Sequence, residues 1–380
     1  MEKCPFASTK NNEQECELAG SPVGNYSEYL KLNSLLQLQV RRTDDPLAHD
    51  EHLFIVMHQN TELWFKQIIY ELRSIQQILH KSKVCEKSQQ IMFQRLVRVN
   101  CILRHMVQQF EILETMSSMD FQAFRGIFKD GQSGFQSTQF RLLEKIIGIK
   151  EEQRCCTFLE KMSDKQKEVA KEKGMGDNED ICSLIYEWLS RTPALDQFIA
   201  CYKEVVGEEI RKLNLAAEEI KLTDPSESEN LFEEAECLRS NFAIIFDPQE
   251  FENSSRRKQG RRIPYMALMG ALMINCYAAE PRFSVPYEIL KNLIDMDELL
   301  VKWRFAHAMM AKRIIGGRQG TGGSGGYIYL RSTVSERYMS FVGLFEVASF
   351  LLPPQKLPGL TAAMKMEISR VYTGDLASEL

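Results

Sequence analysis

Apolar residues recur along most of the chain at steps of three and four, the spacing that places them on one face of an α-helix. The two longest apolar stripes run through 50–81 and 286–315. No run of residues alternates between apolar and polar in the manner of a strand. The pattern predicts an all-α protein with further helices at 27–42, 88–114, 118–128, 137–147, 150–172, 179–191, 194–221, 226–245, 264–279, 332–351 and 360–372.

Local composition divides the chain into four parts. Residues 1–20 are polar and lack periodicity, which predicts a disordered N-terminal tail. Residues 150–262 are richer in charge and poorer in aromatic side chains than their surroundings, which predicts a peripheral helical insertion. The flanking segments 21–149 and 263–380 are then the two parts of one helical domain.

Overall composition is that of an ordinary globular protein. The 380 residues are 44% hydrophobic and 26% charged, and the net charge of −5 argues against nucleic acid as the main partner. No apolar run approaches the ~20 residues that span a bilayer, and the N-terminus lacks the apolar stretch of a secretory signal. The ten cysteines form no CxxC pair, which is typical of free thiols in a reducing compartment. We therefore expect a cytoplasmic protein without membrane contact.

Two histidines interrupt the longest apolar stripes. His58 follows Phe54 by one helical turn, and His307 follows Trp303 by one turn. A buried imidazole needs a partner for its ring nitrogens, and that partner can be a backbone carbonyl, a water or a metal. One such histidine is more often a satisfied core residue than a ligand. A pair on the two longest helices indicates a site between helices.

Two other patterns suggest chemistry less strongly. A non-haem iron site can be drawn from His52, His58 and Glu62, although acidic residues near a helix start are ordinary capping residues. The run GTGGSG at 320–325 matches the glycine pattern of dinucleotide-binding proteins. A helix precedes this run where that fold requires a strand, so we predict a mobile loop near a small ligand, or a plain connection.

Several longer motifs, in order along the chain, resemble those of the tryptophan 2,3-dioxygenase family. The resemblance extends from about Tyr26 to Pro354. It implies an all-helical, haem-dependent homotetramer that opens the indole ring of L-tryptophan with O2 to give N-formylkynurenine, the first step of the kynurenine route. The motifs are HDEHLFIVMHQNTELWFKQI (49–68), FEILETMSSMDFQAFR (110–125), SGFQSTQFRLLEKIIG (133–148), EWLSRTP (187–193), AAEPRFS (278–284), KWRFAH (302–307) and GTGGSGGYIYLRSTVSERY (320–338).

The same resemblance implies a role for individual residues. His307 would be the proximal ligand of the iron of one haem b per subunit, with Trp303 packed beside the haem. His58 would be the distal histidine that receives the indole N–H. The remaining substrate contacts would be Phe54 and Phe121 around the indole, Arg125 at the carboxylate, Thr321 at the ammonium group, and Tyr26 and Tyr29 from a neighbouring subunit.

Four residues depart from the family's usual motifs. Asn60 and Thr61 stand where alanine and tyrosine are usual, and Phe305 and Ala306 replace a tyrosine and an asparagine. Two alternatives stay open, the first of them because of these changes. One is a divergent haem-binding paralog that senses haem or gas, or that oxidises another indole or a phenol. The other is a helical interaction protein without a cofactor.

Overall fold

The structure is a computed structural model that describes residues 24–128, 137–150, 180–253, 263–320 and 326–373. The tail expected over 1–20 lies outside these residues, and so does the helix expected at 150–172. Every regular element in the described ranges is a helix and none is a strand, which confirms the all-α class.

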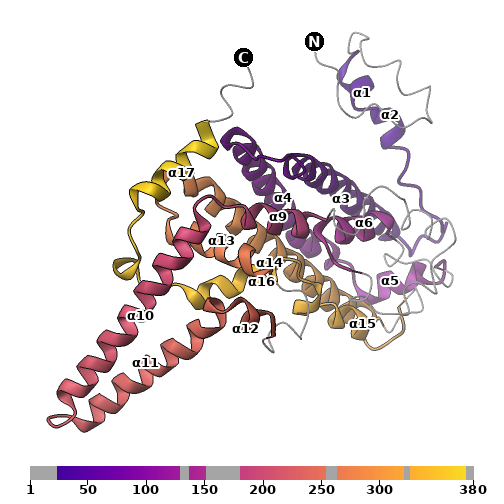
Figure 1. Ribbon diagram of the computed structural model, residues 1–380. Helices are drawn as coiled ribbons and strands as arrows, with labels where there is room; N and C mark the ends of the chain where they lie inside the picture. The colour runs from indigo at the N-terminus through magenta and orange to yellow at the C-terminus, as the bar shows by residue number, and fades with distance from the viewer. Residues whose placement is uncertain (1–23, 129–136, 151–179, 254–262, 321–325, 374–380) are drawn as a thin grey trace.

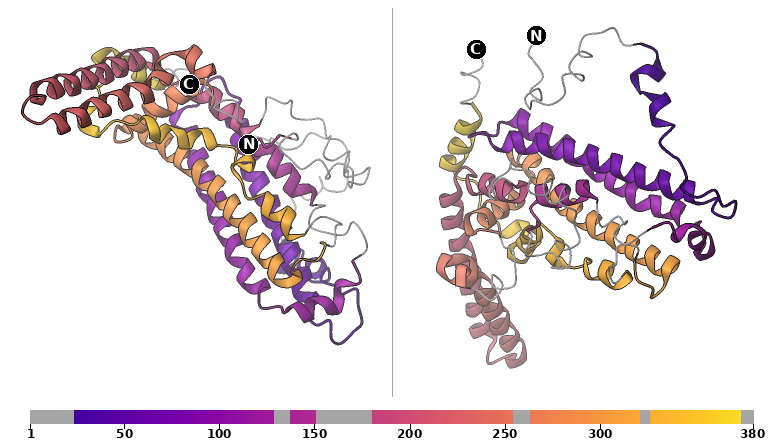
Figure 2. Two further views of the ribbon diagram at one scale, coloured as in Figure 1. Left: turned by 90° about the horizontal axis from the view of Figure 1, so that it is seen from below. Right: turned by 90° about the vertical axis from the view of Figure 1, so that its right-hand side faces the viewer.

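Three long helices form the body and frame the site (Figure 1). They are α3 (Glu51–Leu79), α4 (Glu86–Leu113) and α14 (Pro281–Ile315). Helix α4 packs against both of the others. Figure 2 shows the three running side by side along the long dimension of the body. The sequence predicts all three, because their apolar stripes are long and uninterrupted by turn residues.

Aliphatic side chains at helical spacing hold α3 against α4. Each is buried, and full burial of a side chain of this size contributes about 1.5–3 kcal/mol. They are Ile68, Leu72, Ile75 and Leu79 on α3, and Met92, Leu96, Val99 and Leu103 on α4. A buried polar contact fixes α4 to α14, since the Asn100 amide nitrogen donates to the Asn292 carbonyl oxygen at 2.9 Å.

The single helix expected at 27–42 is wrong. The structure has two short helices there, α1 (Tyr26–Tyr29) and α2 (Leu32–Leu35), followed by extended chain. Lys31 lies between them in the left-handed region with φ of 51°, which ends the first helix. Leu30, Leu35, Leu36 and Leu38 are exposed, so the segment buries little apolar surface that would sustain a longer helix.

The helix expected at 332–351 is also wrong. The chain there forms α15 (Tyr327–Ser332), a 3₁₀ turn, α16 (Val342–Phe345) and a second 3₁₀ turn. The buried carboxylate of Asp297 accepts hydrogen bonds from the backbone N–H groups of Ser340, at 3.1 Å, and Phe341, at 2.6 Å. These charge-assisted bonds hold the backbone in an extended turn, which a pattern of apolar residues does not reveal.

Two further helices close the core behind the site. Helix α9 (Ile181–Ser190) packs on α13 (Tyr265–Cys276), and their close approach depends on Gly270. A Cβ atom at that position would lie 2.1 Å from the carbonyl oxygen of Leu189. Only glycine therefore fits at this crossing.

The other helices surround this body. Helices α10 (Leu195–Ile220) and α11 (Pro225–Phe246) pair into a hairpin that projects from it (Figure 1). The division into a helical domain and an insertion at 150–262 stays a prediction. None of the described helices combines the length and the apolar character that a membrane-spanning helix requires. The remaining elements are α5 (Ser118–Arg125), α6 (Thr138–Ile147), α12 (Pro248–Asn253), α17 (Ala362–Thr373) and the 3₁₀ turns Glu336–Tyr338, Glu346–Phe350 and Pro354–Lys356.

Candidate active site

A cavity of about 1340 Å³ lies between α3, α4, α6 and α14. Pockets for one small molecule usually hold about 300–1,000 Å³, so this cavity has room for two ligands together. Its walls are largely apolar, with a few polar side chains at defined places. Those polar groups decide what the cavity can bind.

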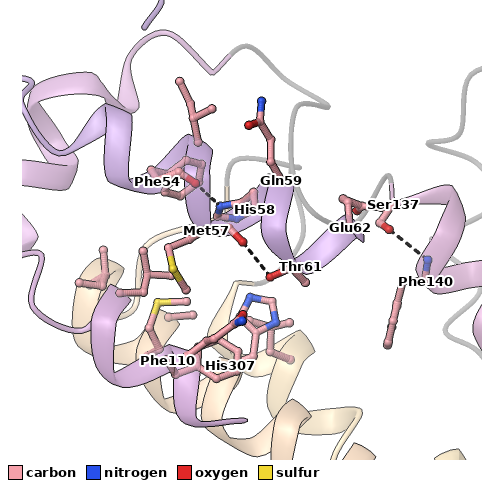
Figure 3. Close-up of a pocket in the computed structure, with 18 of the residues that line it drawn as sticks. Phe54, Met57, His58, Gln59, Thr61, Glu62, Phe110, Ser137, Phe140 and His307 are labelled. Carbon is pink, nitrogen blue, oxygen red and sulfur yellow. Dashed lines mark hydrogen bonds between the residues drawn. The ribbon is translucent and has the colours of Figure 1, made fainter. Parts of the chain in front are cut away.

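The two histidines singled out by the sequence both line this cavity. His58 comes from α3 and His307 from α14, and they approach the same space from different helices (Figure 3). Phe110 of α4 stacks on the His307 ring, with the ring centroids 5.9 Å apart and the planes 18° from parallel. Trp303 lies one turn earlier, 5.6 Å from the same ring. The imidazole of His307 is thus held between aromatic side chains.

His307 has the properties of a ligand. In the described part of the chain no hydrogen bond reaches either of its ring nitrogens, so both remain available. Burial and, to a smaller extent, charge repulsion from the nearby His58 together lower the pKa of His307 to about 4. His307 is therefore neutral at pH 7 and offers a nitrogen lone pair, which is the form that binds iron.

His58 has a defined proton position. Its Nδ1 lies 2.7 Å from the carbonyl oxygen of Phe54, and because a carbonyl oxygen only accepts, Nδ1 is the protonated nitrogen and donates. The other nitrogen, Nε2, is then a hydrogen-bond acceptor. Burial lowers the pKa of His58, although the ring borders the cavity, and the hydrogen bond to Phe54 and the charge of Glu62 oppose this shift. His58 is consequently a neutral acceptor near pH 7.

Phenylalanines form one end of the cavity. Phe54 lies 5.9 Å from Phe121 and 5.4 Å from Phe128, measured between ring centroids, and all three line the cavity. Tilted and edge-on rings at these distances suit a flat apolar guest. The sequence predicts Phe54 and Phe121 but not Phe128 or Phe110. Helical spacing marks an aromatic residue as inward-facing without showing whether it meets core or cavity.

Buried charges form another part of the cavity wall. Arg304 is only 3% exposed and lies 3.1 Å from the carboxylate of Glu144, while Arg141 lies 2.7 Å from the same group. Arg304 also donates to the carbonyl oxygen of Tyr338 at 3.1 Å. All three charged side chains line the cavity. Sequence reasoning missed this cluster, because arginines on helices are usually solvated.

Arg125 is not among the residues that line the cavity, although Phe121 before it and Phe128 after it are. Its guanidinium donates to the carbonyl oxygen of Gln319 at 2.6 Å, and Arg318 donates to the side-chain oxygen of Gln122 at 2.8 Å. Helix α5 is thereby tied to the residues that precede the glycine-rich run. Thr321, within that run, lies outside the described residues.

Tyr26 and Tyr29 lie on the surface of α1, with 73% and 68% of each residue exposed. Figures 1 and 2 show α1 and α2 standing away from the helical body. Neither tyrosine lines the cavity of its own chain. Their expected role in a neighbouring subunit stays a prediction.

Only one of the four unusual residues lines the cavity. Thr61 does so, and its hydroxyl donates to the carbonyl oxygen of Met57 at 2.9 Å (Figure 3). Phe305 is 45% exposed, and the guanidinium of Arg331 lies over its ring, 5.6 Å from the ring centroid. Asn60 and Ala306 are not among the lining residues. Only Thr61 is therefore placed to change what the cavity binds.

The non-haem iron alternative finds no support. Among the residues that the structure describes, no group of three or more His, Cys, Asp or Glu side chains could hold a metal ion. His52 is exposed, and the Glu62 carboxylate instead accepts a hydrogen bond from Gln139 at 3.0 Å.

A helical body around an apolar cavity with a neutral histidine at its wall is the arrangement of a cofactor-binding enzyme. The family model of tryptophan 2,3-dioxygenase matches residues 8–351 of this sequence. A curated tryptophan 2,3-dioxygenase from Mayetiola destructor is 38% identical over 380 aligned residues, which cover 96% of this chain and 97% of the relative. The chain belongs to the tryptophan 2,3-dioxygenase family.

Proposed function

We propose that this chain catalyses the reaction of its family, in which O2 cleaves the indole C2–C3 bond of L-tryptophan to give N-formylkynurenine. The observation that carries the proposal is the pair of neutral histidines, His58 and His307, on one apolar cavity. No observation favours a haem or gas sensor, an oxidase of another indole or phenol, or a cofactor-free interaction protein.

The residues present fit haem b as the cofactor. His307 would be the protein's ligand to the iron, and Trp303 and Phe110 would pack beside the haem. The apolar walls match the macrocycle. Arg141 and Arg304 both form an ion pair with Glu144, so the three side chains together carry a net positive charge, which suits the haem's carboxylates. Bound haem supplies the oxygen chemistry, and the protein supplies orientation.

The substrate's indole suits the phenylalanine end of the cavity. Phe54 and Phe121 would contact its faces and edges, and Nε2 of His58 would accept the indole N–H. Because the indole N–H is a very weak acid, a neutral imidazole serves to orient the ring rather than to remove its proton. The aromatic side chains exclude water, and this hydrogen bond is stronger where water is absent.

The charged end of tryptophan needs a cation and an acceptor. Arg125 is proposed as the cation, because a guanidinium has five N–H donors and the carbonyl of Gln319 uses only part of them. Thr321 is proposed as the acceptor for the ammonium group. A homotetramer, with Tyr26 and Tyr29 reaching a neighbouring cavity, completes the proposal and is supported by their exposure on a projecting helix.

One assay with two variants tests the proposal. Haem-loaded ferrous protein in air is mixed with L-tryptophan, and N-formylkynurenine is followed by its absorbance. We expect product from the wild type, loss of stable haem binding in His307→Ala, and normal haem binding in His80→Ala, whose imidazole is exposed. Haem-loaded wild type without product would indicate the divergent paralog. Wild type that takes up no haem would indicate the cofactor-free interaction protein.

A further inference from the structure

The chain between α2 and α3 forms a wall of the cavity, although no motif marks it. Leu38, Val40 and Arg42 all line the cavity, as do Phe54 and His58 of α3. The segment has no regular secondary structure. Something other than its own backbone must therefore keep it in place.

The first attachment is Glu51, in the first turn of α3. Glu51 is 1% exposed, and its carboxylate accepts hydrogen bonds from the backbone N–H groups of Arg42, at 2.6 Å, and Thr43, at 3.1 Å. Within the described chain no lysine or arginine pairs with this carboxylate. Burial of a carboxylate is costly because it loses its hydrogen bonds to water, and these two hydrogen bonds replace them. The same two bonds tie residues 42–43 to α3.

The second attachment is Gln59, the residue after His58. Its side-chain oxygen accepts a hydrogen bond from the Gln39 amide at 2.6 Å, and its nitrogen donates to the carbonyl oxygen of Leu38 at 3.0 Å. Both polar atoms of the Gln59 side chain are thus used on the same segment, and residues 38–39 are tied to α3 two turns beyond Glu51.

The two attachment points are about equally far apart on α3 and on the segment that it holds. Glu51 and Gln59 are eight residues apart on a helix, or about 12 Å. Residues 39 and 42 are separated by three extended steps, about 10 Å. The segment therefore runs antiparallel to α3 in an extended form. Phe54 and His58 both lie between the two attachment points.

We propose that Glu51 and Gln59 are positioning residues that hold residues 38–43 as the substrate-side wall opposite Phe54 and His58. This inference rests on the proposed function for its substrate, tryptophan, and on geometry alone for the attachment. The wall would confine the indole against the two α3 side chains and present the guanidinium of Arg42 at the cavity. Arg42 has no ion-pair partner among the described residues.

Limited trypsin digestion tests the attachment without reference to tryptophan. Arg41 and Arg42 are exposed trypsin sites within the wall. In Glu51→Gln, an amide nitrogen replaces one acceptor oxygen and faces a backbone N–H, while Gln59→Ala removes both contacts. We expect cleavage after Arg41 and Arg42 to be several-fold faster in each variant than in the wild type. The matched controls Glu111→Gln and Gln77→Ala change exposed side chains of the same types.

Substrate binding tests the functional part. In the haem-loaded variants we expect an unchanged haem spectrum and a rise of about tenfold in KM for tryptophan, with a smaller change in kcat, and partial recovery in Glu51→Asp. Cleavage rates equal to those of the controls would overturn the attachment. Wild-type KM in both variants, with an active wild type, would overturn the positioning role. If the wild type itself binds no tryptophan, the proposed function fails and the digestion result still decides the attachment.

Discussion

At the residue scale, the site is defined by proton positions more than by residue types. His58 donates from Nδ1 to the carbonyl of Phe54, so only Nε2 can accept from a guest. His307 makes no such bond within the described chain and keeps a lone pair for a metal. The two imidazoles thus have different roles, because within the described chain only His58 is hydrogen-bonded to a carbonyl of its own helix.

Replacement of His58 tests the orienting role. We expect His58→Ala to retain haem and to lower kcat/KM for tryptophan by about tenfold or more, as the loss of one to two kcal/mol requires. The pKa of His58 is lowered below 6.5, so wild-type activity should stay level from pH 8 to 7 and decline only below the usual histidine pKa, as Nε2 becomes protonated. Steady-state kinetics across pH measure both effects. Wild-type kinetics in the variant would place His58 outside the reaction.

At the element scale, apolar periodicity predicts long helices well and short ones poorly. Helices α3, α4 and α14 follow their stripes closely. The segments 27–42 and 332–351 have helical periodicity but break, the first at Lys31 and the second where Asp297 binds the backbone. Where a segment has little apolar area to bury, backbone conformation and tertiary hydrogen bonds decide its structure rather than apolar periodicity.

Two glycines within helices should respond oppositely to alanine. Gly270→Ala would place a Cβ atom 2.1 Å from the Leu189 carbonyl, so we expect it to lower the free energy of unfolding by about 1–3 kcal/mol. At Gly207 in α10 an added Cβ atom would have no neighbour within 4 Å, so Gly207→Ala should raise the free energy of unfolding by about 0.5–1 kcal/mol. Chemical denaturation of both variants measures the difference. Equal effects would contradict the close crossing of α9 and α13.

At the scale of the whole molecule, the cavity makes stability depend on pH. In the haem-free protein His307 has a pKa of about 4, against 6.5 in the unfolded chain. Between these values the unfolded chain binds the additional proton, so acid favours unfolding. We expect the free energy of unfolding to be level above pH 6.5 and to fall below it, by at most about 1.4 kcal/mol per pH unit for this group.

A matched pair of variants isolates this contribution. His307→Leu removes the group from both states and should flatten the decline between pH 6.5 and 5, measured by denaturant titration at each pH. His80→Leu, at an exposed helix end, should leave the decline unchanged. A decline of wild-type steepness in His307→Leu would show that other groups cause it.

The helical class, the three long helices, the two histidines and, through the motifs, the family can all be predicted from the amino-acid sequence. These features follow from periodicity and residue type, which are local. The tertiary structure alone decided which nitrogen of His58 carries the proton, the burial of Arg304 against Glu144, and the attachment of residues 38–43 by Glu51 and Gln59. Each of these is a contact between segments that no local pattern links, so it is decided only when the helices have packed.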